Sequence, residues 1–131
     1  MTLSVTTRSD DGFESTSAIR AFSTEIDPAG EDAPDTLESL LAAYAACYIP
    51  ALRVTAQRRE LGDLGVVEID VEGELDDGKL DSIAFDITTD ADLQPDDADR
   101  LVSGANDLCK VHAALRPGLY ARITIDGHTI E

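Results

Sequence analysis

Hydrophobic and polar residues alternate with a period of two in several segments, and these segments predict strands. Residues 2–26 alternate loosely and are rich in Thr, Ser, Val and Ile, which predicts two strands joined around residues 9–12. Residues 67–75 alternate apolar with acidic side chains, and residues 80–90 return after an Asp-Asp-Gly-Lys turn. This pattern predicts a hairpin with one solvated acidic face. Residues 119–126, LYARITID, predict a final strand.

A period of three to four residues predicts a long helix after the polar loop of residues 27–35, with Asp35 or Thr36 as its cap. Its apolar stripe consists of Leu37, Leu40, Leu41, Tyr44, Tyr48 and Leu52. The other flank is mostly alanine, so the helix is expected to be buried centrally. Pro50 interrupts the pattern, and because the apolar period resumes beyond it, a kink is favoured over a break.

A second helix is expected to open at Gln94-Pro95 and to close at Arg116-Pro117-Gly118. The resulting order of strands, helix, strands, helix and strand, with short hairpin links, predicts an α+β fold with antiparallel sheet. The length of 131 residues corresponds to one domain, residues 1–131, that is large enough to bury a core. A hydrophobic content of 43% argues against disorder despite the charge.

The charge is strongly acidic, with 10 Lys and Arg residues against 27 Asp and Glu residues and a net charge of −17. Such a surface repels nucleic acid, whose recognition needs a basic patch. The acidic residues are spread along the whole chain, as in proteins from a salt-saturated cytoplasm, where salt screens the self-repulsion. We therefore expect a halophilic source and no nucleic-acid partner. A site for a basic partner would predict a single acidic face and is the less favoured interpretation.

The longest strongly apolar run, LLAAYAACYIPAL, is too short to span a bilayer and contains a proline. The first residues, MTLSVTTRSDDG, lack the basic-then-apolar plan of a signal peptide. A cytoplasmic protein without a membrane partner is therefore expected. A resting structural disulfide is not expected in that compartment, so its thiols suggest catalysis, metal binding or inert packing.

The chain has two cysteines, Cys47 and Cys109, each in an apolar helical stretch. Free cysteine is among the most buried residue types, so packing alone is the simplest interpretation. Two thiols that meet can instead do two-electron redox chemistry without a cofactor, because one forms a sulfenic acid and the other condenses with it to a disulfide. A third interpretation is a metal site begun by Cys109 and His112, which would need Cys47 and His128 to complete four ligands.

The residues around both cysteines resemble the signatures of the OsmC/Ohr superfamily. Residues 34–47, PDTLESLLAAYAAC, resemble the first signature, in which an acidic residue leads into an alanine-rich helix that ends in Ala-Cys or Gly-Cys. Residues 109–115, CKVHAAL, resemble the second signature. The order of elements agrees, and the resemblance covers nearly the whole chain. It implies antiparallel sheets with two long central helices, an entwined homodimer, and thiol-dependent reduction of organic hydroperoxides.

Carried over by this resemblance, Cys47 matches the peroxidatic cysteine and Cys109 the resolving cysteine. Glu38 matches a glutamate that orients an arginine against the thiolate, although a first-turn charge on a helix explains it equally well. Arg20 matches an arginine of less characterised OsmC-like proteins, and Arg8 is the other candidate. The Gly-rich N-terminal segment that carries this arginine in the best-characterised hydroperoxidases is absent. A cation beside the thiolate would lower its pKa and stabilise the departing alkoxide.

The sequence thus predicts a peroxidase that needs neither cofactor nor metal and takes an organic hydroperoxide as substrate. A dithiol reductant would regenerate the Cys47/Cys109 pair, since thiolate exchange is the only route the sequence offers. The alternative is a non-catalytic small-molecule or acyl-chain binding protein on the same fold, with both cysteines as packing residues.

Overall fold

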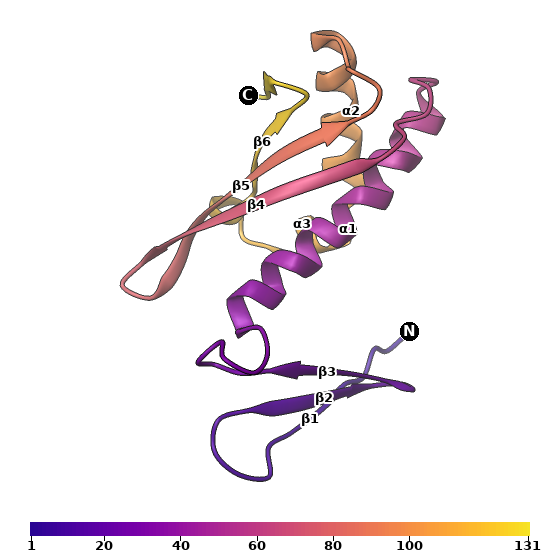
Figure 1. Cartoon of the computed structure of the whole chain (residues 1–131). Helices are drawn as coiled ribbons and strands as arrows, with labels where there is room; N and C mark the ends of the chain where they lie inside the picture. Colours follow the sequence, from indigo (N-terminus) through magenta and orange to yellow (C-terminus); the bar gives the residue numbers. More distant parts are fainter. The chain divides into compact units, whose positions relative to one another are not determined.

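The computed structural model describes residues 1–131, which form two compact units, Met1–Leu40 and Leu41–Glu131 (Figure 1). The first unit holds a small sheet, and the second holds a larger sheet with its helices. This mixed α+β architecture with antiparallel sheets is the fold class predicted from the sequence. Both thiols lie in the second unit.

The sheet of the first unit has three antiparallel strands in the order β1-β2-β3. They span Thr6–Arg8 (β1), Ser15–Ile19 (β2) and Phe22–Ile26 (β3). The predicted turn at residues 9–12 joins β1 to β2, but the sequence pattern missed a second hairpin between β2 and β3. Arg20 stands in that tight turn with a φ of 56°, a left-handed conformation for which its residue type gives no signal. The short connection therefore looked like continuous strand.

Helix α1 spans Thr36–Arg58 and begins at a capping box. The Glu38 N–H donates to Asp35 Oδ1 at 2.8 Å, and the Asp35 N–H donates to Glu38 Oε1 at 2.9 Å. The predicted cap is therefore confirmed. The helix continues through Pro50 without a break. Its 23 residues are long and apolar enough to cross a membrane by length and composition, but a buried stripe that includes Tyr44 and Tyr48 makes it a core helix.

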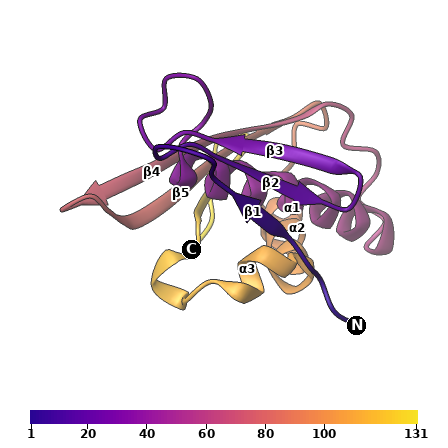
Figure 2. The ribbon, with the colours of Figure 1, turned by 90° about the horizontal axis from the view of Figure 1, so that it is seen from below.

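The sheet of the second unit has four strands in the order β4-β5-β6-β7. The predicted hairpin is confirmed as β4, Val67–Asp76, paired antiparallel with β5, Lys79–Thr89. Strand β6, Arg122–Ile125, runs parallel to β5, and β7, His128–Thr129, is antiparallel to β6. The parallel pair follows from the helical crossover between β5 and β6, because parallel neighbours need such a connection. Figure 2 shows α1 and α2 on one side of the β4–β5 hairpin.

The crossover is made of three helical pieces where the sequence predicted one helix. They are α2 (Pro95–Leu108), α3 (Lys110–Ala114) and the 3-10 turn η1 (Pro117–Leu119). Pro95 opens α2 as predicted. The helix stops at Cys109, whose backbone is extended with φ −71° and ψ 114°. This interruption aims the first N–H groups of a new helical turn at the sulfur atoms, as described below.

The two long helices approach closely where Gly104 of α2 faces Thr55 of α1. A Cβ at Gly104 would lie 2.8 Å from Thr55 Oγ1, so only glycine fits there. At one end of this contact Arg59 Nη1 donates to the Arg100 carbonyl at 2.8 Å. The core beneath is built from the inward faces of both helices and of the sheet. Its largest fully buried side chains are Tyr44, Tyr48, Phe85, Leu52, Leu64, Ile83, Ile87, Leu101, Ile125, Val102 and Cys109.

Candidate functional site

The structure brings the two predicted cysteines together within the second unit. Cys47 comes from the middle of α1 and is half-buried, whereas Cys109 lies at the α2–α3 junction and is fully buried. Each thiol affects the pKa of the other, so they are neighbours. Both are free, and they are not at disulfide distance. A disulfide between them therefore requires a local movement of the chain.

The first turn of α3 faces both sulfur atoms with its backbone N–H groups. Cys109 is the N-cap of α3, and its Sγ accepts the His112 N–H at 3.4 Å. The N–H groups of Val111 and Lys110 hydrogen bond with the Cys47 thiol and lower its pKa. These groups have no acceptor inside a helix, because the first four N–H groups of any helix lack one. The helix interruption at Cys109 thus creates the hydrogen bond donors that the thiols use.

The pKa values of the two thiols are shifted in opposite directions. Partial burial raises the pKa of Cys47, but the N–H of Val111, the Cys109 thiol and then Lys110 together bring it below the usual value. Burial raises the pKa of Cys109, and the neighbouring Cys47 raises it further. The hydrogen bond from the His112 N–H lowers it, but by less. Cys47 is therefore the better nucleophile at neutral pH, since the thiolate is the reactive form.

Aromatic side chains lie near Cys109. Burial raises the pKa of Tyr44 and of Tyr48, and the charge of Cys109 raises both further. The Tyr44 hydroxyl lies 2.7 Å from His112 Nδ1 and accepts the Ala121 N–H at 3.1 Å. The His112 ring stacks on Tyr120 with 3.9 Å between the ring centroids. The sequence pattern placed Tyr44 on the apolar stripe but gave no sign of its polar contacts, because the partners lie far along the chain.

The predicted helper residues Glu38, Arg20 and Arg8 lie in the first unit. The Oε1 atom and the N–H of Glu38 both take part in the capping box described above, so its local bonds match the first-turn interpretation. Arg20 lies over the Phe22 ring at 5.1 Å and forms no ion pair. Arg8 pairs with Asp10 at 2.6 Å on the exposed surface. The roles expected for these residues toward Cys47 stay predictions.

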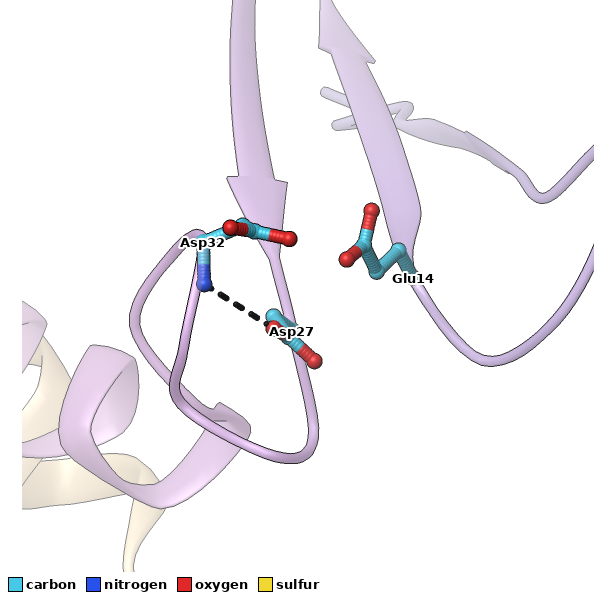
Figure 3. A group of neighbouring side chains, drawn as sticks. All are labelled: Glu14, Asp27 and Asp32. Carbon is cyan, nitrogen blue, oxygen red and sulfur yellow. Dashed lines mark hydrogen bonds between the residues drawn. The ribbon is translucent and has the colours of Figure 1, made fainter.

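The four side chains considered for a metal site do not gather at one point. The His112 Nδ1 is occupied by Tyr44, and His128 Nε2 donates to the Leu93 carbonyl at 2.7 Å. The group that could hold an ion by its geometry is instead Glu14, Asp27 and Asp32, in the first unit (Figure 3).

Asp27 in this acidic group is committed to the backbone. Its carboxylate accepts the N–H groups of Asp32 at 3.0 Å, Ala29 at 2.9 Å and Glu31 at 3.1 Å, and these bonds hold its pKa below the usual value. A hydrogen bond with Asp32, and then the charge of Asp27, raise the pKa of Glu14. The Asp27 carboxylate therefore serves first to shape the loop before α1.

Comparison with known proteins decides the family. The family model described as OsmC-like protein matches residues 29–123. This chain belongs to the OsmC-like family. An uncharacterized protein of Haloferax volcanii is 40% identical over 126 residues, which cover 95% of this chain and 96% of that relative. The relative supports the halophilic source expected from the charge.

Solved structures share the OsmC-like fold of this chain. The OsmC-like protein from Mycoplasma pneumoniae has a TM-score of 0.77 at 14% identity over 95% of this chain and 97% of that one. The organic hydroperoxide resistance protein OhrB of Bacillus subtilis has 0.71 at 23% identity, with 95% and 98% covered. The organic hydroperoxide resistance protein OsmC from Legionella pneumophila has 0.71 at 20% identity, with 95% and 96% covered.

Proposed function

We propose that this OsmC-like protein is a cytoplasmic thiol peroxidase that reduces organic hydroperoxides through Cys47 and Cys109. The observation that carries this proposal is the unequal acidity of two neighbouring free thiols. The names of the Bacillus and Legionella structural relatives, which are organic hydroperoxide resistance proteins, support the same substrate class. The proposal treats residues 1–131 as one functional domain.

In the first step the Cys47 thiolate attacks one peroxide oxygen and breaks the O–O bond. Cys47 becomes a sulfenic acid, and the alkoxide takes a proton and leaves as an alcohol. In the second step the Cys109 sulfur attacks the sulfenic sulfur, which forms the Cys47–Cys109 disulfide and releases water. A dithiol reductant then returns both thiols by exchange and is itself oxidised to a disulfide.

Formation of the disulfide requires Cys109 to leave its present place. Its sulfur caps α3 through the His112 N–H and is fully buried. Because the two thiols are not at disulfide distance, the α3 turn must shift or Cys109 must rotate before the sulfur atoms bond. Cys47, which is half-buried, is the thiol that a peroxide can reach first.

A cation completes the proposed site. We assign this role to Arg20, with Arg8 as the alternative, and Glu38 would fix the position of the guanidinium. Arg20 forms no ion pair, so its charge is not neutralised by a neighbouring carboxylate. Its positive charge would stabilise both the Cys47 thiolate and the alkoxide that leaves the peroxide.

A homodimer is part of the proposal because apolar surface is left uncovered in each unit. In the first unit, Phe13 in the β1–β2 connection and Phe22 in β3 are exposed, at 87% and 62% of their surface. On α1, the side chains of Ala42, Ala46 and Pro50 are exposed in the same helix that carries Cys47. A second copy of the chain is the partner that the family resemblance implies, and it would cover apolar side chains such as these.

The full burial of Cys109 favours a second candidate function. A thiol with no exposed surface in an aromatic environment is also what inert packing produces. The chain could then be a non-catalytic binding protein for a small molecule or acyl chain on the same fold. This candidate predicts that neither thiol responds to a hydroperoxide.

A thiol titration separates the two candidates. Free thiols are counted in molar KCl before and after one equivalent of cumene hydroperoxide. We expect the native protein to lose both thiols, the Cys109→Ser variant to lose its one thiol, and the Cys47→Ser variant to keep its thiol. Survival of both native thiols in millimolar peroxide would instead support the binding protein.

A further inference from the structure

The Tyr44 hydroxyl joins both ends of the segment that runs from the α3 turn to the start of β6. It lies 2.7 Å from His112 Nδ1, and it accepts the N–H of Ala121 at the start of the last strands at 3.1 Å. These two residues bracket the end of α3 and the whole of η1. One hydroxyl of α1 thereby fixes the return path of the chain from the thiols to β6.

The polarity of this bond follows from the contacts of the hydroxyl. The oxygen accepts a hydrogen bond from the Ala121 N–H, and His112 Nδ1 is the only acceptor bonded to the hydroxyl, so the hydroxyl proton points to Nδ1. Burial lowers the pKa of His112, although the charge of Asp107 opposes this effect. The lowered pKa keeps the imidazole ring neutral, so that Nδ1 can accept a hydrogen bond. Stacking on Tyr120, at 22° between the ring planes, holds the ring in that orientation.

His112 is also the residue whose backbone reaches the resolving thiol. Its N–H donates to Cys109 Sγ at 3.4 Å, while its ring is held by Tyr44. The preceding residues Lys110 and Val111 present their N–H groups to Cys47. A displacement of the His112 backbone would therefore shift its own N–H at Cys109 and, through the adjoining peptides, the N–H groups of Val111 and Lys110 at Cys47.

We propose that the Tyr44–His112 hydrogen bond is a clamp that holds the α3 turn against α1 and keeps its backbone donors aligned on both thiols. Tyr44 and His112 are then positioning residues for the redox pair. The proposal deepens the peroxidase function proposed above and rests on it for its biological meaning. The alignment itself exists whether or not a peroxide is reduced.

The test measures the acidity of Cys47 in the full chain. The rate of alkylation by iodoacetamide is followed against pH in molar KCl, and peptide mass spectrometry separates Cys47 from Cys109. We expect Tyr44→Phe to raise the apparent pKa of Cys47 by about half a unit to one unit, because misalignment would weaken a backbone hydrogen bond that stabilises the thiolate by that amount.

The chain offers a matched control in Tyr48. Its hydroxyl donates to Asn106 Oδ1 at 2.7 Å, so Tyr48→Phe removes a buried bond of the same length from the same helix. That bond leads to α2 and away from the α3 turn. Tyr48→Phe should therefore leave the pKa of Cys47 as in the native protein. An equal shift in both variants would contradict the clamp, since general loosening of the core would explain it.

A second pair of variants keeps the test valid if Tyr44→Phe does not fold. His112→Asn retains an acceptor close to the position of Nδ1, whereas His112→Leu removes it. We expect the pKa of Cys47 to rise in His112→Leu and to stay nearer the native value in His112→Asn. Identical values in both variants would overturn the proposal.

Peroxide consumption by the native protein is measured in parallel. If the native protein consumes no peroxide while the variants shift the pKa of Cys47 as expected, the clamp stands and the proposed function fails. If peroxide is consumed and Tyr44→Phe and His112→Leu shift nothing, the clamp fails alone.

Discussion

The thiols of Cys47 and Cys109 are neighbours whose pKa values are shifted in opposite directions. Burial raises the pKa of Cys109, while hydrogen bonds from the α3 turn, led by Val111, overcome the effect of partial burial at Cys47 and lower its pKa. Burial of Cys109 and the α3 donors at Cys47 thus give two identical side chains different chemistry. The following predictions test this difference and the structure that produces it.

Alkylation of the native protein should occur at Cys47 first. The Cys47 thiol is more acidic and half-buried, whereas Cys109 is fully buried. We expect a rate ratio of at least about tenfold at neutral pH, because both thiolate fraction and access favour Cys47. Peptide mapping after a short exposure to iodoacetamide measures the ratio. Faster labelling of Cys109 would contradict the description of the site.

Replacement of Glu38 by Gln separates its two possible roles. Glutamine can still accept the Asp35 N–H in the capping box, so the stability should change little. The charge that would orient an arginine is lost, and we expect peroxide turnover to fall by about tenfold or more. Thermal unfolding and peroxide consumption are measured on the same samples.

Glu38→Ala is the companion variant for the capping box, and it should lower stability by roughly 1 kcal/mol as well as turnover. Full turnover in Glu38→Gln would show that the residue is a helix cap alone.

Asp126 should make the free energy of unfolding depend on pH in the acid range. Burial raises its pKa, but hydrogen bonds from the Thr89 hydroxyl at 2.7 Å, the Thr89 N–H at 2.8 Å and the Leu93 N–H at 3.1 Å bring it below the usual value. A lowered folded pKa gives stability that is present at neutral pH and is lost as the pH falls through that value. We expect Asp126→Asn to be less stable at pH 7 and to lose less stability on acidification.

A matched control for this effect is Asp77→Asn. Asp77 has a φ of 52° and Asp126 a φ of 46°, and each precedes a glycine in a turn, but Asp77 is fully solvated. The free energy of unfolding, measured with denaturant between pH 7 and pH 3, should fall with pH as steeply in Asp77→Asn as in the native protein. If the free energy of unfolding of Asp126→Asn falls with pH as steeply as that of the native protein, Asp126 is not the cause of the acid dependence.

Gly104→Ala should destabilise the contact between α1 and α2. The added Cβ would overlap the side chain of Thr55, which cannot swing away easily because it is β-branched and buried. Overpacking of this kind costs about 1–3 kcal/mol. Gly118→Ala is the control, because a Cβ there meets nothing within 4 Å. Equal unfolding midpoints in urea for the two variants would contradict the close approach.

The elements that the sequence predicted well are those that local pattern determines. A few neighbouring residues are enough to predict the strand from the alternation in residues 67–75, the helix start from the cap at Asp35, and the start of α2 from its proline. The hairpin at Arg20 was missed because a left-handed φ at arginine carries no compositional signal. The interruption at Cys109 was missed because no glycine or proline lies between residues 105 and 115 to signal it.

Of the candidate site, only the two thiols could be predicted from the sequence. Cys47 and Cys109 stood out by residue type and by resemblance to a family, and the structure places them together. The donors that distinguish them are backbone N–H groups of Lys110 and Val111, which any residue other than proline could provide. The Tyr44–His112 bond joins positions far apart in the chain, so no local pattern could reveal it.

The most direct test of the redox pair is the mass of the protein after peroxide. The native protein is treated in molar KCl with one equivalent of cumene hydroperoxide, blocked with iodoacetamide, digested without reductant and mapped by mass spectrometry. We expect a single cross-linked species in which the peptides of Cys47 and Cys109 have together lost about 2 Da, the two thiol hydrogens that disulfide formation removes. Recovery of both peptides in alkylated form, even after millimolar peroxide, would contradict a Cys47/Cys109 peroxidase.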